Sequence, residues 1–165
     1  AVLNWVYIIT YWPVVMGLGL VLFIRNRPRF YYYRTVVAVS LVFALVIFAA
    51  YPVSPPFDIT SQFVDTIQVH GPSLYGGPVM AATYNTHAAM PSLHFCWTLI
   101  LGVLFLRSLR AWVKVLGVLY PAMTFLAITI TGNHFILDAV AGAILAGVAF
   151  GVVELGFRER FSLGR

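Results

Sequence analysis

The chain has 165 residues, of which 61% are hydrophobic and 9% charged, and its formal net charge is +5. A soluble domain is about 45–50% apolar and about 25% charged, and a domain of this length cannot hide so large an apolar excess in its interior. The composition therefore excludes a soluble enzyme and a disordered chain. The single cysteine, Cys96, also excludes an internal disulfide and a cysteine-based metal site.

Apolar segments, each ended by polar or basic residues, predict a helical membrane bundle, because roughly 20 apolar residues are needed to cross a bilayer. We expect residues 1–165 to form one all-α membrane domain with about five spans, and a further span before residue 1 stays open. The third span is short, so we expect it to tilt or to start in the interface. The expected spans are 5–24, 35–51, 92–106, 112–130 and 135–155.

Residues 53–91 hold most of the Asn, Gln and Asp residues and predict a long polar loop outside the bilayer. With five spans, this loop and all four histidines lie on one side of the membrane, and every Lys and Arg lies on the other. The positive-inside rule makes the basic side cytoplasmic. We therefore expect a cell-membrane protein whose loop faces the periplasm or lumen, whose C-terminus is cytoplasmic, and which has no nucleic-acid partner. The basic residues, which also suit anionic headgroups, are Arg25, Arg27, Arg29, Arg34, Arg107, Arg110, Lys114, Arg158, Arg160 and Arg165.

Several aromatic residues lie near the ends of the first two spans. Trp and Tyr are typical of the membrane interface, and we interpret these residues as interfacial anchors. They are Trp5, Tyr7, Tyr11, Trp12, Tyr31, Tyr32 and Tyr33.

Three residues able to move protons lie near the start of two spans. His94 is just inside the third span, His134 opens the fifth, and Asp138 follows His134 by one helical turn on the same face. A carboxylate inside a membrane helix is costly and normally has a partner and a function. We expect Asp138 to hydrogen-bond His134 at about 2.6–3.2 Å and to fix its tautomer as in a catalytic dyad. A structural pair that ties helix ends together is an equally good interpretation.

The segment 85–94 contains the strongest local pattern. Pro91 and Ser92 are typical of a helix start, and the free N–H groups of a first turn bind anions. A phosphate there would meet Ser92, with His94 within the first turn as a proton donor. His87 is a candidate for the same pocket or a loop residue without a role. Two histidines and one aspartate suffice for phosphoryl transfer through a phosphohistidine, so we expect neither a metal nor a cofactor.

The residues 91–94, followed by His134-x3-Asp138, resemble the type 2 phosphatidic acid phosphatase superfamily. More narrowly, residues 88–94 and 131–138 resemble its inositolphosphoryl-transferase branch, which is related to the aureobasidin-resistance protein. The resemblance implies a helical membrane fold and a lipid phosphate or phosphodiester substrate. The acceptor is water in the phosphatases and an alcohol in the transferases.

The resemblance also implies a role for each matching residue. His134 would attack phosphorus and become the phosphohistidine, and Asp138 would orient it. His94 would protonate the leaving alkoxide and then activate the acceptor, while Ser92 would hold a phosphoryl oxygen.

The chain lacks the cationic residues that the superfamily pattern usually has near its histidines. The signature Lys-x6-Arg-Pro is absent, Ala127 and Ile128 stand where Ser-Arg is usual, and the histidine-bearing side has no Lys or Arg. Phosphoryl transfer relies on cationic stabilisation. The intact set of Ser92, His94, His134 and Asp138 leads us to expect a lipid phosphatase or headgroup transferase. The missing cations favour the alternative, a catalytically silent member that serves as a membrane subunit or scaffold of a larger complex.

Small residues line one side of the last span. They are Gly142, Ala146, Gly147 and Gly151. The spacing Gly147-x3-Gly151 permits close helix packing. We favour packing within the fold, and a membrane-protein partner on this face is the other interpretation.

Overall fold

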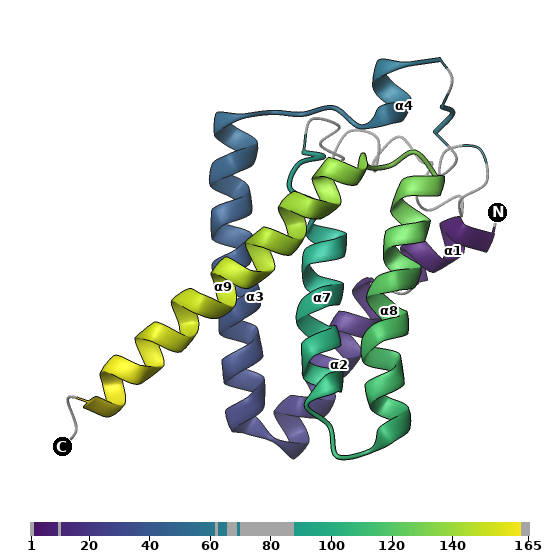
Figure 1. Ribbon diagram of the computed structural model, residues 1–165. Coiled ribbons are helices and arrows are strands. Elements are labelled where there is room, and N and C mark those ends of the chain that lie inside the picture. The colour runs from purple at the N-terminus through teal and green to yellow at the C-terminus, as the bar shows by residue number, and fades with distance from the viewer. Residues whose placement is uncertain (1, 10, 62, 66–68, 70–87, 163–165) are drawn as a thin grey trace.

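The computed structural model describes residues 2–9, 11–61, 63–65, 69 and 88–162, and its regular structure there is helical apart from one bridge between Val53 and Ala88. This confirms the expected all-α fold (Figure 1). The helices are α1 (Val2–Ile9), α2 (Trp12–Arg25), α3 (Arg27–Ala50), α4 (Pro56–Ile59), α7 (Leu93–Leu106), α8 (Ala111–Ile130) and α9 (Ile136–Ser162).

Within this described part, four segments are long and apolar enough to cross a bilayer. They are Leu3–Arg25, Arg27–Ala50, Ala111–Ile130 and Ile136–Gly156. The fifth passage is α7, whose 14 residues span about 21 Å, less than the roughly 30 Å of a hydrocarbon core. The chain therefore passes five times between the two ends of the bundle, as expected of a polytopic integral membrane protein (Figure 1).

The first passage, Leu3–Arg25, consists of two helices rather than one continuous helix. Helix α1 ends at Ile9 and α2 begins at Trp12, with Pro13 in its first turn. A proline lacks the N–H needed inside a helix and clashes with the preceding turn, but it suits a helix start. The break sets the positions of Tyr7 and Tyr11, on either side of it.

Helix α7 lies at the centre of the bundle, in contact with α3, α8 and α9. It meets α8 at a pair of glycines. A Cβ built on Gly102 would lie 2.7 Å from the Gly117 carbonyl oxygen, and one on Gly117 would lie 2.8 Å from the Gly102 carbonyl oxygen. The two backbones are therefore in direct contact, which is how small residues permit close packing of membrane helices.

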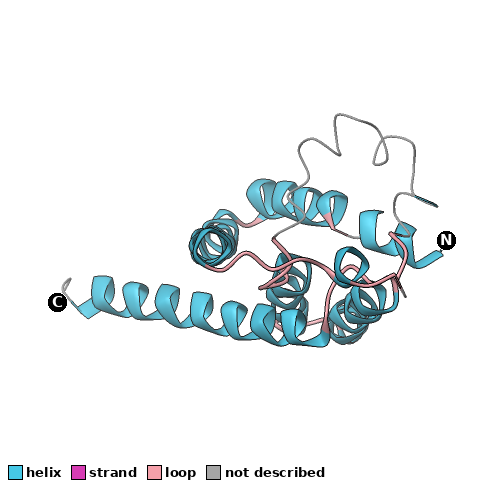
Figure 2. Ribbon diagram, turned by 90° about the horizontal axis from the view of Figure 1, so that it is seen from above, coloured by secondary structure: helices cyan, strands magenta, loops and turns pink. Residues whose placement is uncertain are grey.

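Helix α9 packs against α3 and α7, and its contacts reach as far as Phe150 and Glu154. A Cβ on Gly142 would lie 2.5 Å from the Ser92 carbonyl oxygen, and Ala146 is buried. Cβ atoms on Gly147 and Gly151 would have no heavy atom within 4 Å. Seen from above, α9 extends well beyond the other helices (Figure 2). Internal packing thus accounts for Gly142 and Ala146, and a partner at Gly147 and Gly151 stays a prediction.

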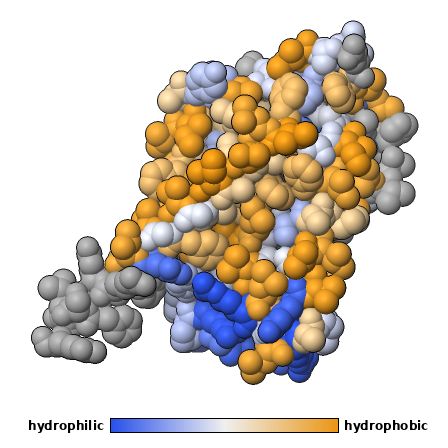
Figure 3. All heavy atoms as spheres, viewed as in Figure 1, coloured by the Kyte–Doolittle hydropathy of each residue, from blue (hydrophilic) through white to orange (hydrophobic). Residues whose placement is uncertain are grey.

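The two ends of the bundle differ in chemistry. We call the end with the α2–α3 and α7–α8 junctions the arginine end, because Arg25, Arg27, Arg29, Arg107 and Arg110 lie there. Hydrophilic side chains gather at this lower end, below an apolar flank (Figure 3). We call the opposite end, where α7 and α9 begin, the histidine end.

Candidate active site

Helix α7 begins at the histidine end with Ser92 as its N-cap. The Ser92 hydroxyl oxygen accepts a hydrogen bond from the Phe95 N–H at 3.4 Å, and its carbonyl accepts from the Cys96 N–H at 3.0 Å. Serine is among the preferred residues for this position. The helix start predicted from Pro91 and Ser92 is therefore confirmed, and it places His94 in the first turn.

A backbone contact joins this helix start to α9. The Ser92 N–H donates to the Asp138 carbonyl at 3.0 Å, and the missing side chain of Gly142 leaves room for the Ser92 carbonyl. Ser92 itself is fully buried. The start of α7, which carries His94, and the start of α9, which follows His134, are therefore held against each other at the site itself.

The turn between α8 and α9 places His134. Its centre is Gly132, whose φ of 71° is a left-handed conformation that glycine adopts without strain. The N–H groups of Asn133 and His134 both donate to the Ile128 carbonyl, at 3.1 and 3.0 Å. The Asn133 side chain donates to the Thr131 hydroxyl at 2.6 Å. These bonds fix the backbone of His134 two residues before α9 begins.

His134 and Asp138 are adjacent but do not form the expected hydrogen bond. Their Nδ1 and Oδ2 atoms are 3.5 Å apart, with side chains 8% and 2% exposed. The same Oδ2 accepts from the Phe135 N–H at 2.8 Å, because a carboxylate in the first turn of α9 can cap its unpaired amides. The expected distance is thus wrong, and the Asp138 carboxylate caps the helix while it lies 3.5 Å from Nδ1 of His134.

The consequence is an unpaired polar atom in the interior. Nδ1 of His134 is buried and has no hydrogen-bond partner among the described residues. Such an atom costs about 1–3 kcal/mol. A group kept at that cost in a membrane protein is typical of a functional site.

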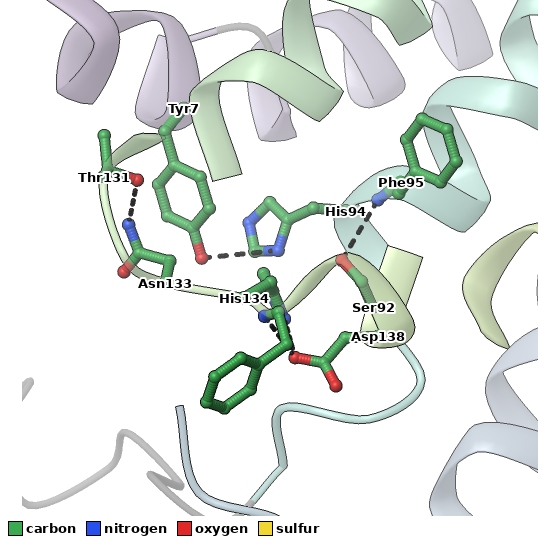
Figure 4. A network of polar contacts seen from close by, with 9 residues as sticks. Tyr7, Ser92, His94, Phe95, Thr131, Asn133, His134 and Asp138 are labelled. Atoms are coloured by element: carbon green, nitrogen blue, oxygen red, sulfur yellow. Dashed lines mark hydrogen bonds and ion pairs between the residues drawn. The ribbon is translucent and has the colours of Figure 1, made fainter. Parts of the chain in front are cut away.

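His94 lies beside His134 and in contact with Tyr7 (Figure 4). The two imidazole centroids are 6.1 Å apart. The Tyr7 hydroxyl lies 3.4 Å from Nδ1 of His94, and the two rings stack with centroids 4.2 Å apart. The Tyr11 ring also contacts His94, at 4.0 Å. The structure therefore brings together residues from α1, α7 and the turn between α8 and α9 that are distant in sequence.

Tyr7 and Tyr11 were missed as site residues by sequence reasoning, which interprets them as interfacial anchors. Both are only 6% exposed, whereas Trp5 and Trp12 are about half exposed and fit that interpretation. One available signal is Asn4, a polar residue in an apolar run that is 1% exposed. Its spacing to Tyr7 and Tyr11 matches one helical face, which would have predicted a polar, inward side.

Two further points of the sequence analysis concern His87 and the pair Ala127 and Ile128. His87 falls outside them, so its role stays a prediction. The two positions where Ser-Arg is usual, Ala127 and Ile128, are fully buried, and Ile128 packs with Tyr7 and Ala139. These two positions therefore add apolar packing, and no charge, beside Tyr7.

Comparison with known proteins gives one match. A family model described as the PAP2 superfamily matches residues 1–152. Neither a curated protein nor a solved structure matches the chain. The matched range contains Ser92, His94, His134 and Asp138 together with the helices that position them.

Proposed function

The chain belongs to the PAP2 superfamily, and from this membership we propose that it is an integral-membrane lipid phosphatase or phosphoryl-headgroup transferase that works through a phosphohistidine on His134. Membership supports a membrane phosphatase or phosphotransferase in general. The observation that carries the finer proposal is the buried cluster at the histidine end, where two imidazoles have centroids 6.1 Å apart and one of them lies beside Asp138.

In the first step, Nε2 of His134 attacks phosphorus and the bond from phosphorus to the alkoxide oxygen breaks. His94, as imidazolium, gives its proton to that oxygen, and the alcohol leaves. The other nitrogen of His134 carries a proton that faces Asp138, whose carboxylate balances the charge of the phosphohistidine. The 3.5 Å contact shortens as this charge develops.

In the second step, His94 takes a proton from water or an acceptor alcohol, whose oxygen then attacks phosphorus. The phosphorus–nitrogen bond breaks, its electron pair returns to His134, and both histidines regain their starting states. Attack needs about 3–3.5 Å between reacting atoms, and proton transfer needs about 2.6–3.2 Å. Both requirements are met only if the two imidazoles flank one phosphoryl group, as their spacing allows.

Ser92 contributes to binding of the phosphoryl group in this proposal. Its oxygen already accepts from the Phe95 N–H, so its own O–H remains to donate to a phosphoryl oxygen. The first turn of α7 adds its positive dipole end. His87 completes the proposed phosphate-binding residues.

A groove next to the site supports a lipid substrate. It has a volume of about 470 Å³, is bounded by α2, α3 and α7, and has an almost entirely apolar lining that includes Trp12, Trp97 and Leu101. Trp97 follows His94 by three residues, and the Tyr11 ring contacts both of them. An acyl chain in this groove would leave its phosphate close to His94.

The acceptor is the finer part of the proposal. Residues 88–94 and 131–138 favour the inositolphosphoryl-transferase branch, in which an alcohol takes the place of water. Assays with and without a polyol acceptor on the same phosphodiester lipid separate the two reactions.

The decisive experiment compares purified wild type with His134→Ala on a lipid phosphate and on a phosphodiester lipid with an alcohol acceptor. We expect wild-type turnover, an acid-labile phosphoenzyme, and the loss of both in His134→Ala. A chelator should leave turnover unchanged, because no proposed step uses a metal. A wild type that is inactive on both substrates and matches His134→Ala would instead support the silent membrane subunit.

We propose that the histidine end faces the periplasm or lumen and that the arginine end and the C-terminus are cytoplasmic, because the positive-inside rule places exposed arginines inside. Single cysteines at Gly76 and, as the matched control, at Ser108 in a Cys96→Ala background test this with an impermeant thiol reagent. We expect labelling at position 76 in intact cells and at position 108 only after lysis. The reverse pattern would overturn the orientation.

A further inference from the structure

Tyr7 brings a hydroxyl group within hydrogen-bond distance of the His94 ring. Its hydroxyl lies 3.4 Å from Nδ1 of His94, and the two rings stack with an interplanar angle of 25°. Tyr7 is 6% exposed and packs with Ile128 and Ala139. The buried phenol thus stacks on the plane of the imidazole and places its oxygen beside one ring nitrogen.

We propose that Tyr7 is a positioning residue that holds the proton of neutral His94 on Nδ1, so that Nε2 alone gives and takes the catalytic proton. A neutral imidazole has one N–H and one acceptor nitrogen. The Tyr7 hydroxyl can either donate to Nδ1 or accept from Nδ1–H, and we assign the second direction, which leaves Nε2 as the acceptor nitrogen. The proton-transfer role of His94 rests on the proposed function, whereas the choice of tautomer does not.

The two histidines differ in the charge of their partners, and this difference suits different tasks. His134 lies beside the carboxylate of Asp138, which favours an imidazole that becomes cationic when it binds phosphorus. His94 lies beside a neutral phenol, which orients the ring without the strong stabilisation that a carboxylate gives to imidazolium. A proton donor must release its proton to the leaving alkoxide, so a neutral partner serves it better.

The tautomer is measured directly by nitrogen NMR on protein labelled with ¹⁵N-histidine, at about pH 8 where an ordinary imidazole is neutral. A His94→Gln sample identifies the His94 signals. We expect Nδ1 to be protonated in wild type and to lose that preference in Tyr7→Phe. Tyr11→Phe is the matched control, because it removes a hydroxyl from the other ring that contacts His94 and should keep the wild-type signals.

Kinetics supply the second readout. On a substrate with a basic alkoxide leaving group, Tyr7→Phe should lower kcat about tenfold, the effect of one hydrogen bond. On an activated aryl phosphate, which needs little acid assistance, the loss should be less than about threefold. KM should change little in both cases, and Tyr11→Phe should keep the wild-type ratio between the two substrates.

The outcomes separate this inference from the proposed function. Unchanged His94 signals in Tyr7→Phe, or equal losses of kcat on both substrates, would overturn the positioning role and leave Tyr7 as a packing residue. A wild type without turnover on any lipid phosphate would overturn the proposed function, and the tautomer measurement would then decide the role of Tyr7 by itself.

Discussion

The histidine end and the arginine end differ in how far their polar side chains are buried. Ser92, His134 and Asp138 are almost fully buried and are positioned by backbone hydrogen bonds from neighbouring elements. Arg107 and Glu154 form a 3.6 Å ion pair with side chains about half exposed. Burying polar groups in a membrane protein is costly, whereas exposed charges cost little. The difference teaches that the histidine end is built for a specific geometry and the arginine end for a charged surface.

The arginine end also contains several cationic side chains of the same kind, two of which contact tyrosine rings. The Arg34 guanidinium lies over the Tyr31 ring at 5.1 Å, and that of Arg107 lies over the Tyr32 ring at 5.9 Å. The Tyr32 hydroxyl raises the pKa of Arg107 further, so this side chain stays charged at any physiological pH. Because several cations contribute to the proposed orientation, each is replaceable, whereas each member of the histidine cluster occurs once.

The sharpest test of this contrast is Asp138→Asn. The amide oxygen can still accept from the Phe135 N–H and keep the helix cap, but it cannot balance a cationic His134. We expect kcat to fall by about two to four orders of magnitude, by analogy with other carboxylate–histidine dyads, with the helical content retained in circular dichroism. Asp58→Asn, which changes an exposed acid on α4, is the matched control and should retain wild-type kcat.

A second test probes the close approach of α7 and α9. In Gly142→Ala, the new Cβ would lie 2.5 Å from the Ser92 carbonyl oxygen, so one helix must move and the site must widen. A displacement of about 1 Å in an active site can cost about 10²-fold in rate, which a kcat measurement detects. Gly147→Ala, five residues further along the same helix with open space around it, should have no effect. Equal kcat values for the two variants would show that the helix contact does not set the site.

The smallest effect is expected at the arginine end. Replacing Arg107 by Gln or Glu154 by Gln should change the free energy of unfolding by no more than about 1 kcal/mol, because half-exposed ion pairs contribute little. Catalysis should be unaffected, since both residues lie at the far end of the bundle from His134. A double-mutant cycle measured by denaturant titration in detergent checks this, and a coupling energy well above that value would contradict the proposed division of roles.

Local patterns in the sequence determined the fold class and most of the candidate site. The lengths of the apolar runs predict the helical bundle, because crossing a bilayer needs a minimum number of apolar residues. Pro91 and Ser92 predict the start of α7, because helix capping depends on neighbouring residues alone. The four-residue spacing puts His134 and Asp138 on one face for the same reason. Each of these inferences concerns residues within a few turns of each other.

Only the tertiary structure decided the features that depend on contacts between distant helices. The Tyr7–His94 contact joins residues 87 apart in the sequence, and the role of Gly142 depends on which helix packs against it. The 3.5 Å separation of His134 and Asp138 is a local feature, but residue spacing gives only their shared helix face and not the bond of the same carboxylate oxygen to the Phe135 amide. Periodicity along one chain segment assigns a residue to a helix face, but the side chain that meets that face is set by how the helices pack.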